Sequence, residues 1–164
     1  MDYSEWYKRI AAPFRRNAGA RFLEMLDKLL VVGFVAAYAV LLAVLLATGD
    51  SRLLGAIVVP GATYAIARAV RTLVNRPRPY EACDIDPLIK KDTHGKSMPS
   101  LHMTCAAIIA IACFQVWPVG GSVLFCACIC IAFTRIVGGV HYPTDIVASI
   151  ALAVLCGAIG FSVL

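Results

Sequence analysis

The chain has 164 residues, of which 60% are hydrophobic and 15% charged, and its formal net charge is +5. Soluble domains carry about 25% charged residues, so this composition argues against a soluble enzyme or binding module. Residues 29–47 and 146–164 contain no charged side chain. Because about 20 apolar residues of helix cross a bilayer, the sequence predicts an integral membrane protein.

The N-terminal segment, residues 1–27, is polar, basic and aromatic. This mixture is typical of an amphipathic segment that lies among lipid headgroups, and Pro13 is expected to bend or divide it. A solvated tail is the alternative. A cleavable signal peptide is not expected, because a short apolar core with a small-residue exit is missing here.

Apolar runs after this segment predict an all-α, polytopic membrane helix bundle of about five transmembrane helices in a single domain, 1–164, with the bundle over 28–164. The expected spans are 28–48, 52–74, 99–117, 122–137 and 143–164. Residues 118–121 are expected to form a turn, and a polar loop is expected to join the second span to the third. Six of the seven cysteines lie within the apolar runs. We interpret them as packing residues, since a buried free cysteine behaves as a small hydrophobe; a metal or disulfide role is the alternative.

Ionisable and hydroxyl side chains at helix ends gather at three places in this apolar chain. An ionisable residue within a membrane helix is costly and suggests function. Alternating crossings put the end of the second span, the start of the third and the join of the last two on one side of the membrane. The residues at these places are Arg71, Arg78, Ser100, Leu101, His102, Thr134, Arg135, His141 and Asp145.

These residue types suit phosphoryl transfer. Guanidinium groups match phosphate oxygens, and a helix N-terminus at Ser100 adds further donors. Two histidines suffice for a covalent mechanism, one attacking phosphorus and the other protonating the leaving oxygen. Asp145 follows His141 by four residues, so it can fix the imidazole tautomer. We therefore expect His141 to be the nucleophile and His102 the general acid, which then activates water.

Each of these residues also has a simpler explanation. A single arginine at a helix end commonly extends to the membrane interface, and a single histidine can be structural. A protein of another class, a non-catalytic membrane protein that binds or transports an anion, would use the same arginines. Its expected signature is the loss of His141 or Asp145, and both are present.

Three motifs resemble the signature of the type-2 phosphatidic acid phosphatase (PAP2) superfamily, which reads Lys-x6-Arg-Pro, Pro-Ser-Gly-His and Ser-Arg-x5-His-x3-Asp. The corresponding residues are Arg71-x6-Arg78-Pro79, Pro99-Ser100-Leu101-His102 and Thr134-Arg135-x5-His141-x3-Asp145. Arginine replaces lysine in the first motif, leucine replaces glycine in the second, and threonine replaces serine in the third. Vanadium haloperoxidases share the signature, but the apolar spans argue against a soluble scaffold.

The resemblance implies a small bacterial-type phosphatase of the plasma membrane that forms a phosphohistidine and needs no metal or other cofactor. It implies that His141, His102 and Asp145 are catalytic. Phosphate would be held by Arg71, Arg78, Ser100, Leu101 and Arg135, with Leu101 contributing its backbone N–H.

A lipid phosphate is the expected substrate, because a chain with little mass outside the membrane must work at headgroup depth. A polyprenyl phosphate or diphosphate is favoured, with phosphatidylglycerol phosphate or phosphatidic acid as alternatives. The expected partners are this substrate and the membrane lipids, with no nucleic acid. The excess of lysine and arginine on the active-site side favours the cytoplasmic face, whereas the family resemblance favours the opposite face.

Overall fold

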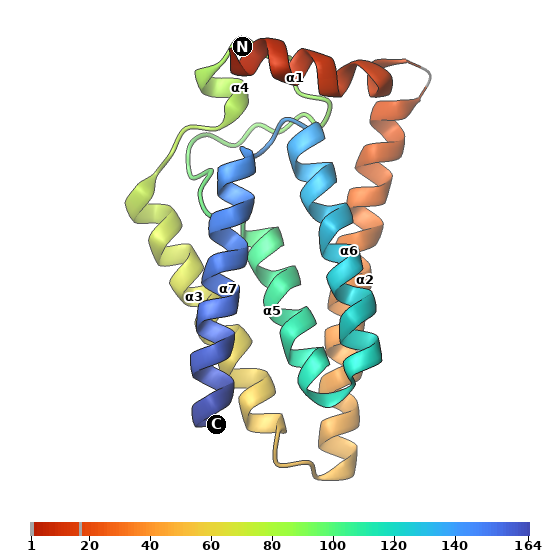
Figure 1. The fold of residues 1–164 in the computed structure, drawn as a ribbon, viewed down its shortest axis with the longest axis vertical. Helices are drawn as coiled ribbons and strands as arrows, with labels where there is room; N and C mark the ends of the chain where they lie inside the picture. The colour runs from red at the N-terminus through yellow and green to blue at the C-terminus, as the bar shows by residue number, and fades with distance from the viewer. Residues whose placement is uncertain (1, 17) are drawn as a thin grey trace.

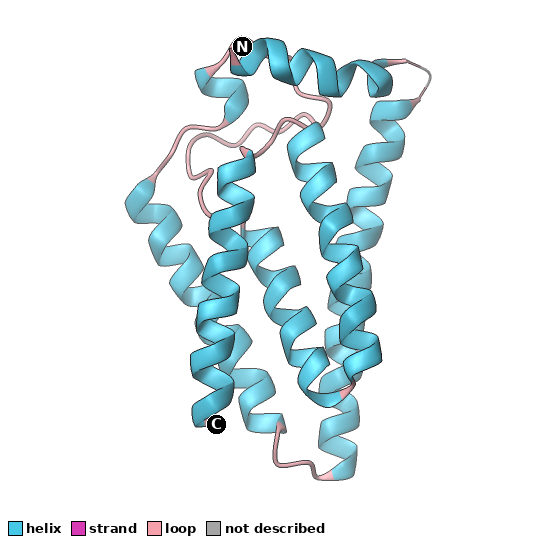
Figure 2. Ribbon diagram, in the orientation of Figure 1, coloured by secondary structure: helices cyan, strands magenta, loops and turns pink. Residues whose placement is uncertain are grey.

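Helices make up most of the computed structural model, which describes residues 2–16 and 18–164 (Figures 1 and 2). No strand is present in that part of the chain. The elements in chain order are α1 (Tyr3–Ala11), the 3-10 helix η1 (Ala12–Arg15), α2 (Gly19–Thr48), α3 (Leu53–Val74), α4 (Pro79–Ala82), α5 (Leu101–Val116), α6 (Pro118–Val137) and α7 (Pro143–Val163). The expected all-α, polytopic bundle is therefore confirmed.

Within the described ranges, four helical segments, those containing α2, α3, α6 and α7, are long and apolar enough to cross a membrane. The fifth expected span, α5, has 16 residues. At about 1.5 Å per residue it is shorter than a hydrocarbon core of ~30 Å. Its residues between Met103 and Cys113 are mostly buried, because α2, α3, α6 and α7 surround it. The central helix is thus shielded from lipid.

A proline lies inside α3 without breaking it. Pro60 has no N–H, so the carbonyl of Ala56, four residues earlier, loses its helical donor. The Tyr38 hydroxyl on α2 donates to this carbonyl at 2.8 Å. A neighbouring helix therefore satisfies the freed backbone group, as membrane interiors require.

Two boundaries differ from those expected. Helix α2 begins at Gly19 rather than near residue 28. The turn predicted at 118–121 is wrong, because α6 begins directly at Pro118, whose fixed φ suits a first helical position. Gly121 is there for close packing, since a Cβ atom on it would lie 2.4 Å from the Phe114 backbone.

The connections sort into two ends of the bundle (Figure 1). One end carries the segment after α3, the α6–α7 connection and α1, which lies across that end; the other carries the α2–α3 turn, the α5–α6 junction and the C-terminus. The N-terminus of α5 lies deeper in the bundle than the adjacent ends of α6 and α7. Residues 83–100 descend to reach it, so the three motifs meet below that end of the bundle. We call this meeting place the recess, and the end of the bundle above it the recess end.

Candidate active site

The start of α5 is fastened to α7. Ser100, the residue before the helix, is fully buried, and its backbone N–H donates to the Ser149 hydroxyl at 2.8 Å. The same hydroxyl lies 2.6 Å from the Asp145 carbonyl oxygen. This contact aligns the N-terminal turn of α5 with the first turns of α7, so the second and third motifs share one wall of the recess.

His141 lies in the α6–α7 connection and is 2% exposed. Its Nδ1 is 3.5 Å from Asp145 Oδ2 and 3.4 Å from Ser97 Oγ. The Ser97 hydroxyl donates to the same Asp145 oxygen at 2.5 Å. With that proton committed, Ser97 Oγ accepts from His141 Nδ1–H, which leaves Nε2 unprotonated. The expected pairing of His141 with Asp145 is present, and Ser97 bridges it.

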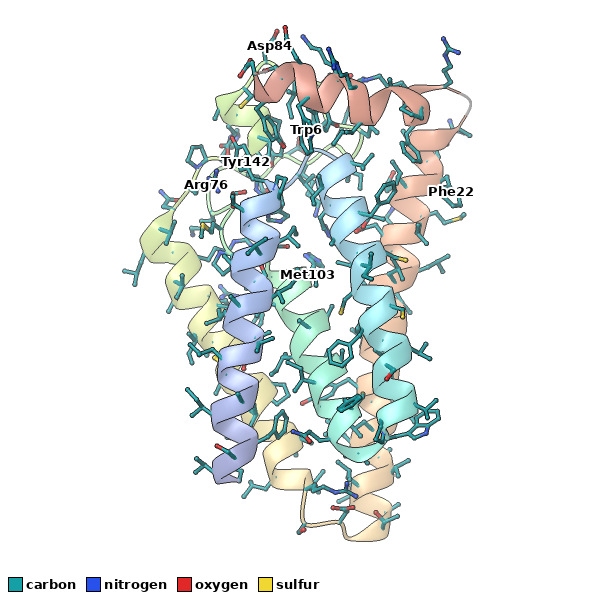
Figure 3. All side chains as sticks on the ribbon, viewed as in Figure 1. Trp6, Phe22, Arg76, Asp84, Met103 and Tyr142 are labelled. Atoms are coloured by element: carbon teal, nitrogen blue, oxygen red, sulfur yellow. The ribbon has the colours of Figure 1, made fainter. Side chains whose placement is uncertain are left out.

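Asp145 is itself held on both carboxylate oxygens. Its Oδ2 accepts the backbone N–H of Tyr142 at 2.9 Å, and its Oδ1 pairs with Arg76 Nη1 at 2.9 Å. The Arg76 guanidinium also stacks over the Tyr142 ring, 4.0 Å from its centroid (Figure 3). These contacts fix the carboxylate whose orientation sets the His141 ring.

Burial lowers the pKa of His141 from 6.5 to about 4, against the opposing effect of the Asp145 carboxylate. Removal from water disfavours the charged imidazolium, and the positive charges of Arg78 and Arg135 act in the same direction. His141 is therefore neutral at physiological pH, which is the form in which an imidazole nitrogen can attack.

Two of the three expected phosphate-binding arginines are buried. Arg78 is 4% exposed, and its guanidinium donates to the carbonyls of Gly95 at 3.2 Å and Val140 at 3.3 Å. Arg135 is 1% exposed, and its carbonyl oxygen accepts the His141 N–H at 3.3 Å. Arg71, in the last turn of α3, is half-buried and interacts electrostatically with Arg78 and Asp145.

Three buried donors in this recess lack partners among the residues described here. They are Nε and Nη1 of Arg135 and the hydroxyl of Ser100. A buried donor without an acceptor costs free energy, and such a group in a native structure requires an explanation. A ligand rich in acceptor oxygens would satisfy all three.

His102 differs from His141 in its surroundings. Its side chain is exposed, and it lies with Leu101 on the wall of an apolar groove of about 280 Å³. The groove is formed by residues of α2, α3, α5 and α6: Val31, Phe34, Val35, Tyr64, Leu101, His102, Cys105, Ala106, Ile109 and Ile131. These ten residues define what is called the apolar groove below. Ser100, two residues before His102, is fully buried, so His102 lies between the groove and the buried polar residues.

The structure thus brings Arg78, Ser100, Arg135, His141 and Asp145 into one buried network, with Arg71 and His102 at its edge. Sequence reasoning missed Ser97, Arg76 and Asp27, which contact Asp145 or Arg135. It also missed Lys91. Burial, and then the charge of Arg135, lower the pKa of this lysine. The position of Ser97 close to the second motif was the available signal for that residue.

Comparisons with known proteins identify the family and match the fold. The model of the PAP2 superfamily matches residues 52–164. The crystal structure of Aquifex aeolicus LpxE superposes with a TM-score of 0.76 at 24% identity, covering 96% of this chain and 93% of that one. The crystal structure of a transmembrane PAP2-type phosphatidylglycerolphosphate phosphatase from Bacillus subtilis superposes with a TM-score of 0.60 at 18% identity, covering 96% and 92%.

No curated protein sequence matches the chain. The two structural similarities concern the fold, which they share over nearly the whole length of both chains. The family model covers well over half of the sequence, including all three motifs. The chain is therefore an integral membrane protein that belongs to the PAP2 superfamily of phosphatases.

Proposed function

We propose that this protein is a lipid phosphatase that hydrolyses a phosphomonoester or diphosphate through a phosphohistidine on His141. The observation that carries the proposal is the buried, neutral His141 beside the Arg135 and Ser100 donors that have no partner within the described chain. A phosphoryl group placed among these donors would meet a nucleophile whose tautomer Ser97 and Asp145 control.

The reaction follows from these positions. Nε2 of His141 attacks phosphorus, the bond from phosphorus to the lipid oxygen breaks, and His102 gives that oxygen a proton. His102 then takes a proton from water, whose oxygen displaces His141 and releases inorganic phosphate. Arg71, Arg78, Arg135, Ser100 and the backbone N–H of Leu101 stabilise the negative charge of both transition states. Each step uses only water and groups of this protein, and we propose that turnover needs no metal.

A lipid-linked substrate is supported by the apolar groove. The leaving oxygen must lie near His102, and the wall next to His102 consists of apolar residues that suit a hydrocarbon chain. We propose a polyprenyl phosphate or diphosphate, with phosphatidylglycerol phosphate and phosphatidic acid as alternatives. A panel of these lipids presented to the purified protein would rank them by kcat/KM.

The test of the mechanism is phosphate release from such a panel by the protein in detergent, with a chelator present. We expect turnover by the wild type and inhibition by vanadate, which mimics the five-coordinate transition state. His141→Ala should lose activity at least roughly 10³-fold. His94→Ala is the matched control, because His94 lies in the exposed loop beside Glu81 and outside the proposed site.

Wild-type turnover by His141→Ala would disprove the phosphohistidine route. Anion binding without turnover by the wild type would favour a binding or transport protein.

We also propose that the active site faces the cytoplasm. The end of the bundle that holds the recess carries most of the lysines and arginines, and positive residues are retained on the cytoplasmic side of membrane proteins.

A further inference from the structure

A buried carboxylate on α2 contacts the motif arginine of α6. Asp27 is 7% exposed, and its Oδ2 pairs with Arg135 Nη2 at 2.9 Å. Its Oδ1 lies 2.9 Å from the hydroxyl of Thr134, which can donate to it. Both side chains of the Thr134-Arg135 pair therefore meet one carboxylate from another helix.

Asp27 lies outside the residues that match the family model, 52–164. Its position on α2 also differs from that of the other acidic residue of the helix. Glu24 pairs with Lys28 one turn away, and both of these side chains are exposed, where an ion pair contributes little to stability. Asp27 instead faces α6, inside the bundle. The carboxylate is therefore positioned to act on the site.

The pairing leaves a specific part of Arg135 available. Asp27 occupies Nη2, while Nε and Nη1 are buried without partners in residues 2–16 and 18–164. Because a guanidinium is planar and rigid, fixing one nitrogen and the plane fixes the direction of the other N–H bonds. A carboxylate at Nη2 also offsets part of the cost of burying the arginine next to Arg78.

We propose that Asp27 is a positioning residue for phosphate binding, a role that rests on the proposed function. It holds the Arg135 guanidinium so that Nε and Nη1 face the phosphoryl oxygens, and Thr134 holds Asp27 in turn. The affinity of the site for an anion therefore depends on the contact between Asp27 and Arg135 as well as on the charge of Arg135. The α2 helix thereby completes a site whose motif residues all come from elsewhere in the chain.

The test uses Asp27→Asn in the full-length protein. Asparagine has nearly the same volume and can still accept from Thr134, but its amide removes the acceptor for Nη2. We expect the dissociation constant for vanadate, measured by calorimetry in detergent, to rise about tenfold or more, since one charge-assisted hydrogen bond orients the arginine. We expect kcat to fall by a similar factor and KM to change less. Asp27→Glu, which keeps the carboxylate, should recover part of both losses.

Glu24→Gln is the matched control, because it removes the same charge from the same helix at an exposed position. It should bind vanadate like the wild type. A purely structural role for Asp27 would lower the yield of folded protein and leave the vanadate dissociation constant of the folded fraction unchanged. That result in Asp27→Asn would overturn the proposal.

Two further measurements distinguish misfolding of Asp27→Asn, failure of the positioning role and failure of the proposed function. Should Asp27→Asn not fold, Thr134→Val removes only the hydroxyl that holds Asp27. It should weaken vanadate binding severalfold, and unchanged binding would count against the proposed positioning role. Calorimetry does not require turnover. A wild type that binds vanadate but hydrolyses no lipid phosphate would therefore contradict the proposed function while the Asp27 comparison could still be made.

Discussion

At the scale of single residues, His141 combines burial as a neutral imidazole with a contact to a carboxylate. Its ring is almost fully buried, and it lies next to two guanidinium groups, so protonation is disfavoured. Its Nδ1 nevertheless faces a carboxylate through Ser97. The first property keeps the imidazole neutral, and the second selects the tautomer. A nucleophilic nitrogen requires both.

The low pKa of His141 predicts a pH dependence of stability. The unfolded histidine takes up a proton near pH 6.5, whereas the folded one resists protonation to about pH 4. Between these values the unfolded state binds more protons, so the His141 contribution, full above pH 6.5, declines as the pH falls to 4. The difference is on the order of 3 kcal/mol. Thermal unfolding in detergent should show that wild type loses stability over this range more steeply than His141→Asn.

His94→Asn provides the control for that comparison, since the side chain of His94 is 87% exposed. Its stability curve should run parallel to that of the wild type across the acidic range. Parallel curves for His141→Asn and the wild type would contradict the inferred burial of a neutral imidazole.

Much of the site could be predicted from sequence, because its residues have motif spacing. The four-residue interval between His141 and Asp145, and the placement of Arg78, Ser100 and Arg135 at helix ends on one side, were sufficient to group them. The supporting contacts were not predictable. Asp27 and Arg76 lie at the margins of apolar runs, where a charged side chain is ordinarily explained by the membrane interface. Only the packing of α2 on α6 reveals the partner of Asp27.

At the scale of elements, α1 covers the end of the bundle where residues 83–100 and the α6–α7 connection lie. Tyr7 is fully buried. Its hydroxyl donates to the Val137 carbonyl at 3.1 Å and accepts the Leu88 N–H at 3.1 Å. Gly139, at φ 77°, passes directly beneath, and a Cβ atom there would lie 2.7 Å from this hydroxyl. One tyrosine on α1 therefore joins the loop before α5 to the last residue of α6, just before the connection that carries His141.

Tyr7→Phe should destabilise the protein by about 1–3 kcal/mol, because it leaves the buried Val137 carbonyl and the half-buried Leu88 N–H without this partner. Faster proteolysis of the loop 83–100 and lower phosphatase activity should accompany a lower unfolding temperature.

Tyr3→Phe is the matched control. The Tyr3 hydroxyl is buried but has no hydrogen-bond partner in the described parts of the chain, so its removal should be neutral or stabilising. Equal losses in the two variants would show that ring packing, rather than the Tyr7 hydroxyl, holds α1 in place.

Hydropathy predicts where most helices lie but cannot predict their depth. The runs that became α3, α6 and α7 were recognisable, as was the polar loop before α5. Hydropathy could not predict two features that depend on packing: the start of α6 and the enclosure of α5. Gly120 and Gly121 were interpreted as a turn, although they allow α6 to start against Trp117 and Phe114. The short central α5 has the composition of a spanning helix, and only its neighbours show that it is enclosed.

At the scale of the whole molecule, the two ends of the bundle differ in charge. Asp50 and Arg52 at the α2–α3 turn pair with each other at 2.6 Å, so that end is nearly neutral. The recess end carries ten lysines and arginines besides Arg68 and the phosphate-binding arginines: Lys8, Arg9, Arg15, Arg16, Arg21, Lys28, Arg76, Lys90, Lys91 and Lys96. Asp84 lies at the outer limit of this end, and Met103, in the first turn of α5, lies far below it (Figure 3). Two alternative roles for this excess are orientation of the protein and attraction of anionic lipid.

Site-directed labelling distinguishes these two roles of the positive charge. In a Cys83→Ser background, Asp84→Cys places an exposed thiol at the recess end, and Ser51→Cys places one at the opposite end. If the charges orient the protein, a membrane-impermeant maleimide should label Ser51→Cys in intact cells and Asp84→Cys only after permeabilisation. The Cys83→Ser background alone should remain unlabelled, because the remaining cysteines lie within the bundle helices. The reverse pattern would place the active site on the outer face and leave lipid attraction as the explanation for the excess of positive charge.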